Sequence, residues 1–136
     1  MAMKFSEDKI GHGYYVTGYE EGAILVNGSP RNTSFIISLE TLIDDWAPTH
    51  IDELCTQHMQ PLLQLQPELV LIGTGETLKF PVIEHYACLI QHNIGVEIMD
   101  SAAACRTYNI LLGEGRKVAA GIILGARGKE QVARDE

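Results

Sequence analysis

The 136-residue chain has no apolar run long enough to cross a membrane. Its longest nearly apolar segments are residues 69–72 and 118–124, whereas a membrane-spanning helix needs roughly 20 such residues. Residues 1–8 lack the apolar core of a secretory signal and the Arg-rich character of an organelle transit peptide. The sequence therefore predicts a protein without a transmembrane segment and with a cytoplasmic location.

Paired cysteines and common catalytic motifs are also absent. The three cysteines, Cys55, Cys88 and Cys105, are widely spaced and form no CxxC pair, which argues against a disulfide framework or a zinc ribbon. The five histidines form no HxH or HExxH pattern, and the chain has no GxSxG, GxGxxG or Walker A motif. We expect no metal site and no bound cofactor, and the sequence specifies no catalytic residue.

Positive charge is missing from a long stretch of the chain. No Lys or Arg lies between Arg31 and Lys79, and the formal net charge is −8. Nucleic-acid binding is not expected, because phosphate contacts require a basic face. The stretch carries many carboxylates, among them Glu40, Asp44, Asp45, Asp52, Glu53 and Glu68. They indicate either a solvated acidic face or a docking surface for a basic partner.

The N-terminal third contains strand-forming residues and turn signals. Residues 14–19, 23–26 and 34–38 are rich in aromatic and β-branched side chains, which predicts three strands. Asn27-Gly28 is a strong hairpin signal, because a type I′ turn needs positive φ at both central residues. The pattern predicts an antiparallel β meander.

Helices and strands alternate in the rest of the chain. Apolar spacing and Pro61 predict a helix over 49–60, and Pro81 begins a second helix that reaches about residue 92. Strands are expected at 69–72 and 96–99, and Asp100 or Ser101 can cap a helix over 101–112. Residues 117–124 form a last strand without alternation, which implies burial on both faces and a central position. The prediction is one α/β domain over residues 1–125 with a mixed sheet, followed by a polar tail at 126–136.

Two loops that follow strands are candidates for a ligand or partner site. Gly73-Thr74-Gly75 follows one strand and Asp100-Ser101 follows the next, so both lie at the carboxyl edge of the sheet. The glycine turn either binds an anion through its amides or is only a tight turn. The candidate site also includes residues of the following helix and of the turn after it: Cys105, Arg106, Asn109, Glu114 and Arg116.

Several of these positions have hypotheses of their own. Asn109 is unfavourable inside a helix, so we expect its amide to bind a partner such as the turn at 113–115. Glu114 and Arg116 are expected to pair with each other or with Arg106 on the surface. Cys105 lies one turn into the helix, where the helix dipole would lower the pKa of its thiol, and this permits a redox-sensor hypothesis.

Together these segments resemble a known family. The Gly73-Thr74-Gly75 turn, the helix with the sequence Ala-Cys-Arg-Thr-Tyr-Asn at 104–109 and the Glu114-Gly115-Arg116 strand start are similar to a domain-of-unknown-function family with archaeal and bacterial members. That family also contains the mitochondrial assembly factor three of respiratory complex I. The resemblance implies a three-layer fold around a five-stranded mixed sheet, with the last strand central and antiparallel to its neighbours. It implies action by protein contacts and supplies no reaction.

The leading hypothesis is therefore a non-enzymatic interaction or assembly protein with a protein partner, linked by resemblance to respiratory-complex assembly. The alternative is a protein that binds a small molecule, such as an anion or a nucleotide, or a cryptic enzyme. Its site would lie at the carboxyl edge of the sheet, between the glycine turn and Ser101.

Overall fold

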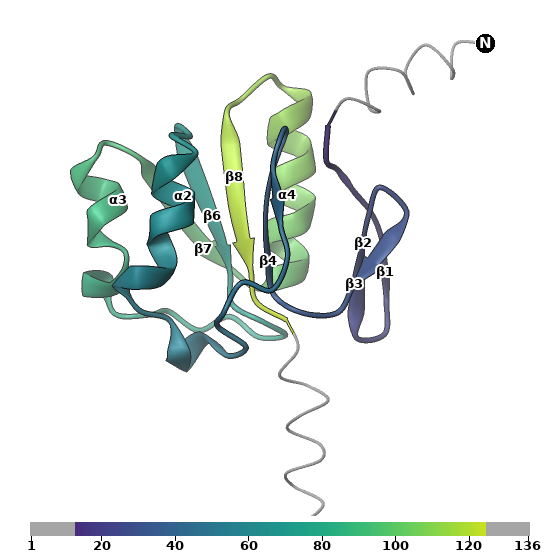
Figure 1. Ribbon diagram of the computed structural model, residues 1–136, viewed down its shortest axis with the longest axis horizontal. Coiled ribbons are helices and arrows are strands. Elements are labelled where there is room, and N and C mark those ends of the chain that lie inside the picture. The colour runs from purple at the N-terminus through teal and green to yellow at the C-terminus, as the bar shows by residue number, and fades with distance from the viewer. Residues whose placement is uncertain (1–12, 125–136) are drawn as a thin grey trace, which may run out of the picture.

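A computed structural model describes residues 13–124, so the predicted tail at 126–136 lies outside the described residues. Its middle layer is a five-stranded mixed sheet with the order β5-β4-β8-β6-β7 (Figure 1). The strands are β4 (Phe35–Ser38), β5 (Leu42–Ile43), β6 (Leu69–Gly73), β7 (Gly95–Met99) and β8 (Val118–Ile122). The predicted α/β class and mixed five-stranded sheet are confirmed.

The last strand, β8, lies at the centre of this sheet as expected. All five of its residues are buried, and they alternate between two cores. Val118, Ala120 and Ile122 face one core, whereas Ala119 and, beyond the strand, Ile123 face the other. The resemblance implied that this strand is antiparallel to both neighbours. That is correct for β4 but wrong for β6, to which β8 runs parallel.

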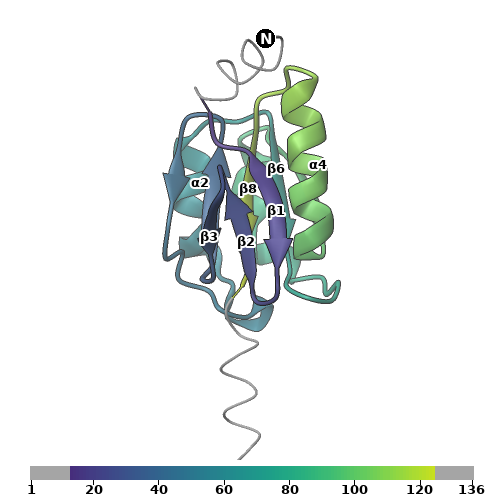
Figure 2. The ribbon, with the colours of Figure 1, turned by 90° about the vertical axis from the view of Figure 1, so that its right-hand side faces the viewer.

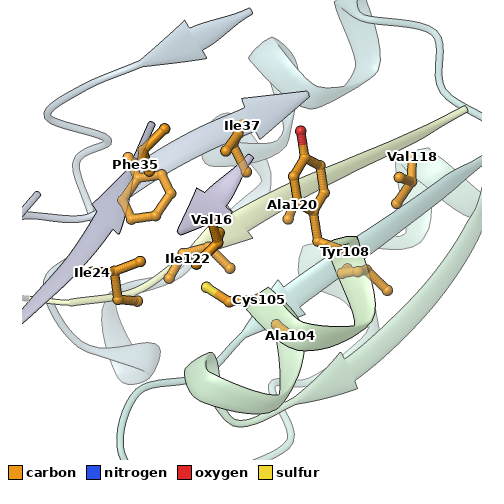
Figure 3. Packing of buried hydrophobic residues seen from close by; sticks show 12 residues of the cluster. Val16, Ile24, Phe35, Ile37, Ala104, Cys105, Tyr108, Val118, Ala120 and Ile122 are labelled. Atoms are coloured by element: carbon orange, nitrogen blue, oxygen red, sulfur yellow. The ribbon is translucent and has the colours of Figure 1, made fainter. Parts of the chain in front are cut away.

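Helices cover both faces of the sheet and complete the three layers (Figure 1). Helix α4 (Ser101–Gly113) packs Ala104, Cys105 and Tyr108 into the first core (Figure 3). The opposite face is covered by Trp46 and by five short elements. These are η1 (Ile51–Glu53), η2 (Thr56–Met59), α2 (Gln60–Gln64), η3 (Ile83–His85) and α3 (Ala87–Gln91).

A second, three-stranded antiparallel sheet stands beside α4 (Figure 2). It consists of β1 (Val16–Glu20), β2 (Ala23–Val26) and β3 (Ser29–Arg31). Asn27 and Gly28 have φ of 50° and 86°, which confirms the expected turn. The third strand of the meander was predicted wrongly: residues 34–38 belong to the main sheet as β4, because Phe35, Ile36 and Ile37 are all fully buried between its two faces.

Two helix predictions also need correction. Residues 49–60 form two 3₁₀ turns rather than one helix, since Leu54 and Cys55 are extended (ψ of 134° and 175°). Pro61 lies in the first turn of α2 and does not end a helix. The predicted helix at 81–92 is a 3₁₀ turn followed by the short α3. The helix after Asp100 is confirmed.

Candidate functional site

The glycine turn and the start of α4 lie side by side at the carboxyl edge of β6. The Gly75 N–H donates to Ser101 Oγ at 2.9 Å, and the Ser101 N–H donates to the Gly75 carbonyl at 2.9 Å. Ser101 Oγ also donates to the Ile123 carbonyl at 2.9 Å. A Cβ on Gly73 would lie 2.8 Å from Ser101 Cα, so only glycine permits this approach. The predicted residues Gly73, Thr74, Gly75, Asp100 and Ser101 are thus brought together.

The amides of this turn already have partners within the protein. The Thr74 N–H donates to the Met99 carbonyl at 2.9 Å, and the Gly75 N–H is bound by Ser101. Asp100 caps α4 by accepting from the Ala103 N–H at 2.8 Å. An anion at this position would have to displace these bonds and approach the Asp100 carboxylate, which disfavours the anion-binding hypothesis.

A groove of about 950 Å³ opens beside this turn. It lies between the β1–β2 hairpin, the loop after β6, the η1 region and the first turn of α4. The lining comprises residues 19–24, 32, 49–51, 74–77, 79, 100–102 and 123–124. The candidate site is therefore built from segments that are far apart in the sequence, and sequence reasoning placed only the residues from 74–75 and 100–101 there.

Carboxylates dominate the charge of the groove. Within residues 13–124, its lining carries Glu20, Glu21, Glu76 and Asp100 but a single lysine, Lys79. The Lys79 ammonium is 2.9 Å from Asp52 Oδ1, and this bond lowers the pKa of the Asp52 carboxyl. The groove consequently favours a cationic occupant over an anionic one.

The acidic stretch between residues 31 and 79 is partly neutralised by cations from both sides. Arg31 pairs with Asp44 at 3.3 Å and Arg116 pairs with Glu68 at 3.3 Å. The Lys117 N–H donates to Glu68 at 2.8 Å, and this bond, followed by Arg116, lowers the pKa of the Glu68 carboxyl. The expected ion pair between Glu114 and Arg116 is therefore wrong, because Arg116 pairs with Glu68 instead.

Cys105 is buried among the side chains of the first core (Figure 3). Burial raises the pKa of its thiol to about 12, against a smaller opposing effect of the Arg106 charge. The expected lowering by the helix dipole is overturned, because desolvation of a thiolate outweighs the dipole at this depth. Cys105 is neither accessible nor activated, which removes the basis of the redox-sensor hypothesis.

The remaining predicted site residues lie away from the groove. Asn109 binds a strand rather than the turn at 113–115: its side chain accepts from the Val16 N–H at 3.1 Å and donates to the Val16 carbonyl at 2.7 Å. Arg106 is exposed on α4. Glu114 and Arg116 follow the C-terminal end of α4, whereas the groove is at its N-terminal end.

Sequence reasoning missed an apolar segment next to the groove. Leu78, Phe80, Val82 and Ile83 are exposed. The signal that could have found this segment is the cluster of large apolar residues around Pro81, because a proline and the residue before it disfavour regular helix or strand there.

Two kinds of feature are absent from the part of the chain that the structure describes. Residues 13–124 contain no group of three or more His, Cys, Asp or Glu side chains placed to hold a metal ion. None of the helices in this range has both the length and the apolar character to cross a bilayer.

The fold and the groove define a class of α/β domain in which a mixed five-stranded sheet carries an extra antiparallel sheet beside its long helix. The chain belongs to the family described as "Protein of unknown function (DUF498/DUF598)", whose model matches residues 16–123. The resemblance expected from the Gly73-Thr74-Gly75 and Ala104–Asn109 segments is confirmed.

Relatives in this family have diverse names. The chain is 32% identical over 127 residues to a "13 kDa major membrane protein" of Francisella tularensis, and the match covers 89% of this chain and 99% of the relative. It is similar to a crystal structure of a Bordetella parapertussis protein with a TM-score of 0.78 and 32% identity, covering 82% of this chain and 96% of that one.

A third relative carries a functional name. The bovine "NADH dehydrogenase [ubiquinone] 1 alpha subcomplex assembly factor 3" is 27% identical over 111 residues, or 80% of this chain. The chain spans 60% of the length of that assembly factor. The similarity thus concerns the shared domain.

Proposed function

We propose that the protein acts by binding another protein during the assembly of a larger complex, and that it performs no reaction of its own. The observation that supports this proposal is the 27% identity with a protein named as an assembly factor, which extends over 80% of the chain. The finer proposal is that the complex assembled is a membrane-associated respiratory complex.

The geometry of the site is consistent with a protein partner. The groove is acidic and open, and exposed apolar side chains lie next to it. Cys105, for which a redox-sensor hypothesis was considered, is buried, and the pKa of its thiol is raised to about 12. These features favour recognition of a surface over chemistry on a small substrate.

Affinity co-purification from native extract at low salt, with the tagged full chain, tests the proposal. We expect a defined partner at a fixed stoichiometry, and the finer proposal requires that it be a subunit or precursor of a respiratory complex. Recovery of no partner would contradict the assembly role, and recovery of an unrelated complex would contradict only the finer proposal.

A small-molecule function is the second candidate, and the groove of about 950 Å³ favours it because ligand pockets have this order of size. Thermal-shift measurements with nucleotides, phosphates and organic acids would test it. A ligand present at about 100 times its Kd stabilises a protein by about 2.7 kcal/mol, which is easily measured. A set of ligands that leaves the Tm unchanged would remove this candidate.

Two further predictions about the surroundings of the protein belong to this proposal. We expect a cytoplasmic location and no binding to nucleic acid, the latter because the formal net charge is −8. Cell fractionation tests the location, and a gel-shift titration with random-sequence DNA and RNA tests the second expectation.

A further inference from the structure

Exposed apolar side chains concentrate in one loop next to the groove. Four of the eight large hydrophobic side chains that are exposed in residues 13–124 lie within six positions: Leu78 (51% exposed), Phe80 (68%), Val82 (55%) and Ile83 (54%). We call residues 78–83 the apolar loop. Single exposed hydrophobic residues are normal on protein surfaces, but a cluster of this size typically marks an interaction surface.

The apolar loop is held in place by polar contacts. Thr74 Oγ1 donates to the Thr77 carbonyl at 2.7 Å and accepts from the Lys79 N–H at 3.3 Å. The Lys79 ammonium binds Asp52 of η1, and Thr56 Oγ1 donates to the Glu84 carbonyl at 3.4 Å. The loop is therefore fixed on both sides although it contains little regular structure. A preformed surface of this kind binds with a smaller loss of conformational entropy.

Negative charge adjoins the apolar loop. Thr77 and Lys79 line the groove, so the apolar side chains of this segment alternate with residues that border its carboxylates. Glu20 and Asp100 contribute two of those carboxylates from the opposite walls. Lys79, the one lysine of the lining among the described residues, is bound to Asp52, so it offsets little of the carboxylate charge. An occupant that covers the apolar loop and extends into the groove would contact apolar side chains on the loop and carboxylates in the groove.

We propose that the apolar loop and the adjoining groove bind a basic amphipathic protein segment, one that combines large apolar side chains with Lys or Arg. This inference rests on the proposed function and names the surface and the partner chemistry. We choose a basic occupant because its positive charge complements the carboxylates of the groove. Anionic lipid headgroups would be repelled by the groove carboxylates, and a second copy of this acidic chain would bring like charges together.

A peptide titration tests the surface directly. The probe is a synthetic amphipathic peptide of leucine and lysine with a fluorescent label, and its affinity is measured by anisotropy at two salt concentrations. We expect Phe80→Ser and Ile83→Ser each to weaken binding by about tenfold, as at buried interface anchors, and Glu20→Gln to weaken it by a smaller factor. The matched control is Ile110→Ser, because Ile110 is 59% exposed on α4 near the end away from the groove.

Four results would overturn the inference. These are no binding of the peptide to the wild-type protein, an equal loss in Ile110→Ser and Phe80→Ser, and equal affinity for a peptide in which glutamate replaces lysine. The fourth is Phe80-dependent binding to phosphatidylcholine–phosphatidylglycerol vesicles with no peptide binding, which would assign the surface to a membrane.

The same variants separate this inference from the assembly role itself. If the wild-type chain recovers a partner from extract and Phe80→Ser recovers it equally, the surface is wrong while the assembly role stands. If the wild-type chain recovers no partner, the assembly role fails, and the peptide titration still decides whether the surface binds basic amphipathic segments. We expect recovery with wild type and Ile110→Ser and loss with Phe80→Ser.

Discussion

Gly73 and Ser101 hold the rim of the groove together through a close backbone approach. Ser101 Oγ links the Gly75 N–H to the Ile123 carbonyl, so one buried hydroxyl ties the ends of β6 and β8 to the start of α4. Gly73 makes this possible because it has no Cβ, which would otherwise lie 2.8 Å from Ser101 Cα. The geometry of the rim thus depends on two small residues, Gly73 and Ser101.

Gly73→Ala should destabilise the fold, since the added methyl meets backbone rather than a flexible side chain. We expect a loss of about 1–3 kcal/mol in the free energy of unfolding, as for other overpacked sites. Gly113→Ala is the matched control: a methyl group added there would meet nothing within 4 Å, and alanine favours a helix, so we expect no loss. Urea denaturation of both variants measures the difference, and equal stability would refute the close-approach argument.

Cys105 should resist alkylation in the folded protein. Burial raises the pKa of its thiol from the usual 9.0 to about 12, so the thiol stays protonated at neutral pH, and the surrounding core excludes the reagent. We expect iodoacetamide to modify Cys55 and Cys88, which are partly exposed, well before Cys105. Mass spectrometry of timed digests measures the three rates, and modification of Cys105 as fast as the other two would contradict its burial.

The same shift predicts a stability change at alkaline pH. Because the pKa is raised in the folded state, the contribution of the protonated thiol is fully present below about pH 9 and is lost as the pH rises towards 12. A Cys105→Ala variant should show a smaller decline in Tm across this range than the wild-type protein. An identical decline would mean that Cys105 does not contribute.

At the scale of elements, Asn109 joins the small sheet to the main body of the fold. Its amide binds both backbone groups of Val16, and the neighbouring Tyr108 hydroxyl donates to the Tyr14 carbonyl at 2.8 Å. These bonds position β1 and, through it, the β1–β2 hairpin beside α4 (Figure 2). Residues of this hairpin form one wall of the groove. A helix residue with poor intrinsic propensity is thus used to fasten a strand.

Asn109→Ala should weaken this attachment by about 1–3 kcal/mol, because it leaves the Val16 N–H and carbonyl without their partners. The matched control is Asn32→Ala at an exposed position, for which we expect a change below about 0.5 kcal/mol. Equilibrium denaturation gives the stability, and hydrogen exchange at the Val16 amide reports the attachment. Unchanged protection at Val16 would contradict the role of Asn109.

Strands β1, β2, β6, β7 and β8 and helix α4 could be predicted from the sequence because their signals are local, whereas the short strands β3 and β5 were missed. Asp100 caps α4 as expected, and the unbroken apolar run of β8 correctly indicated burial on both faces. The same reasoning applied to Phe35-Ile36-Ile37 would have placed β4 in the main sheet. The prediction of one helix over 49–60 was wrong because two hydrogen bonds compete with helical periodicity. His58 Nδ1 accepts from the Cys55 N–H at 3.0 Å and caps η2 locally, and Trp46 Nε1 donates to the His58 carbonyl at 3.0 Å from outside the segment.

The candidate site could be predicted only in part, since its walls come from distant segments. The rule that loops after neighbouring strands share an edge placed Thr74 and Ser101 together. No local pattern shows that the β1–β2 hairpin closes the opposite wall, or that Arg116 pairs with Glu68 at the other end of the domain. Those relations follow from strand order, which the sequence does not encode locally.

At the scale of the whole molecule, the three layers bring an acidic groove and the apolar loop to one edge of the sheet. The two cores on either side of β8 consist of buried side chains, whereas four large hydrophobic side chains of the apolar loop are exposed to solvent. The domain boundary at residue 125 remains a proposal, and limited proteolysis followed by mass spectrometry would test it. The proposed binding surface lies at this edge of the sheet.

Hydrogen exchange of the protein, alone and with its recovered partner, tests that account most directly. We predict slower exchange on binding in two segments that are far apart in the sequence, residues 19–24 and 74–85, with little change at residues 106–116 of the opposite end. Protection confined to the opposite end of α4, or absent from both groove segments, would contradict the assignment of this edge as the binding surface.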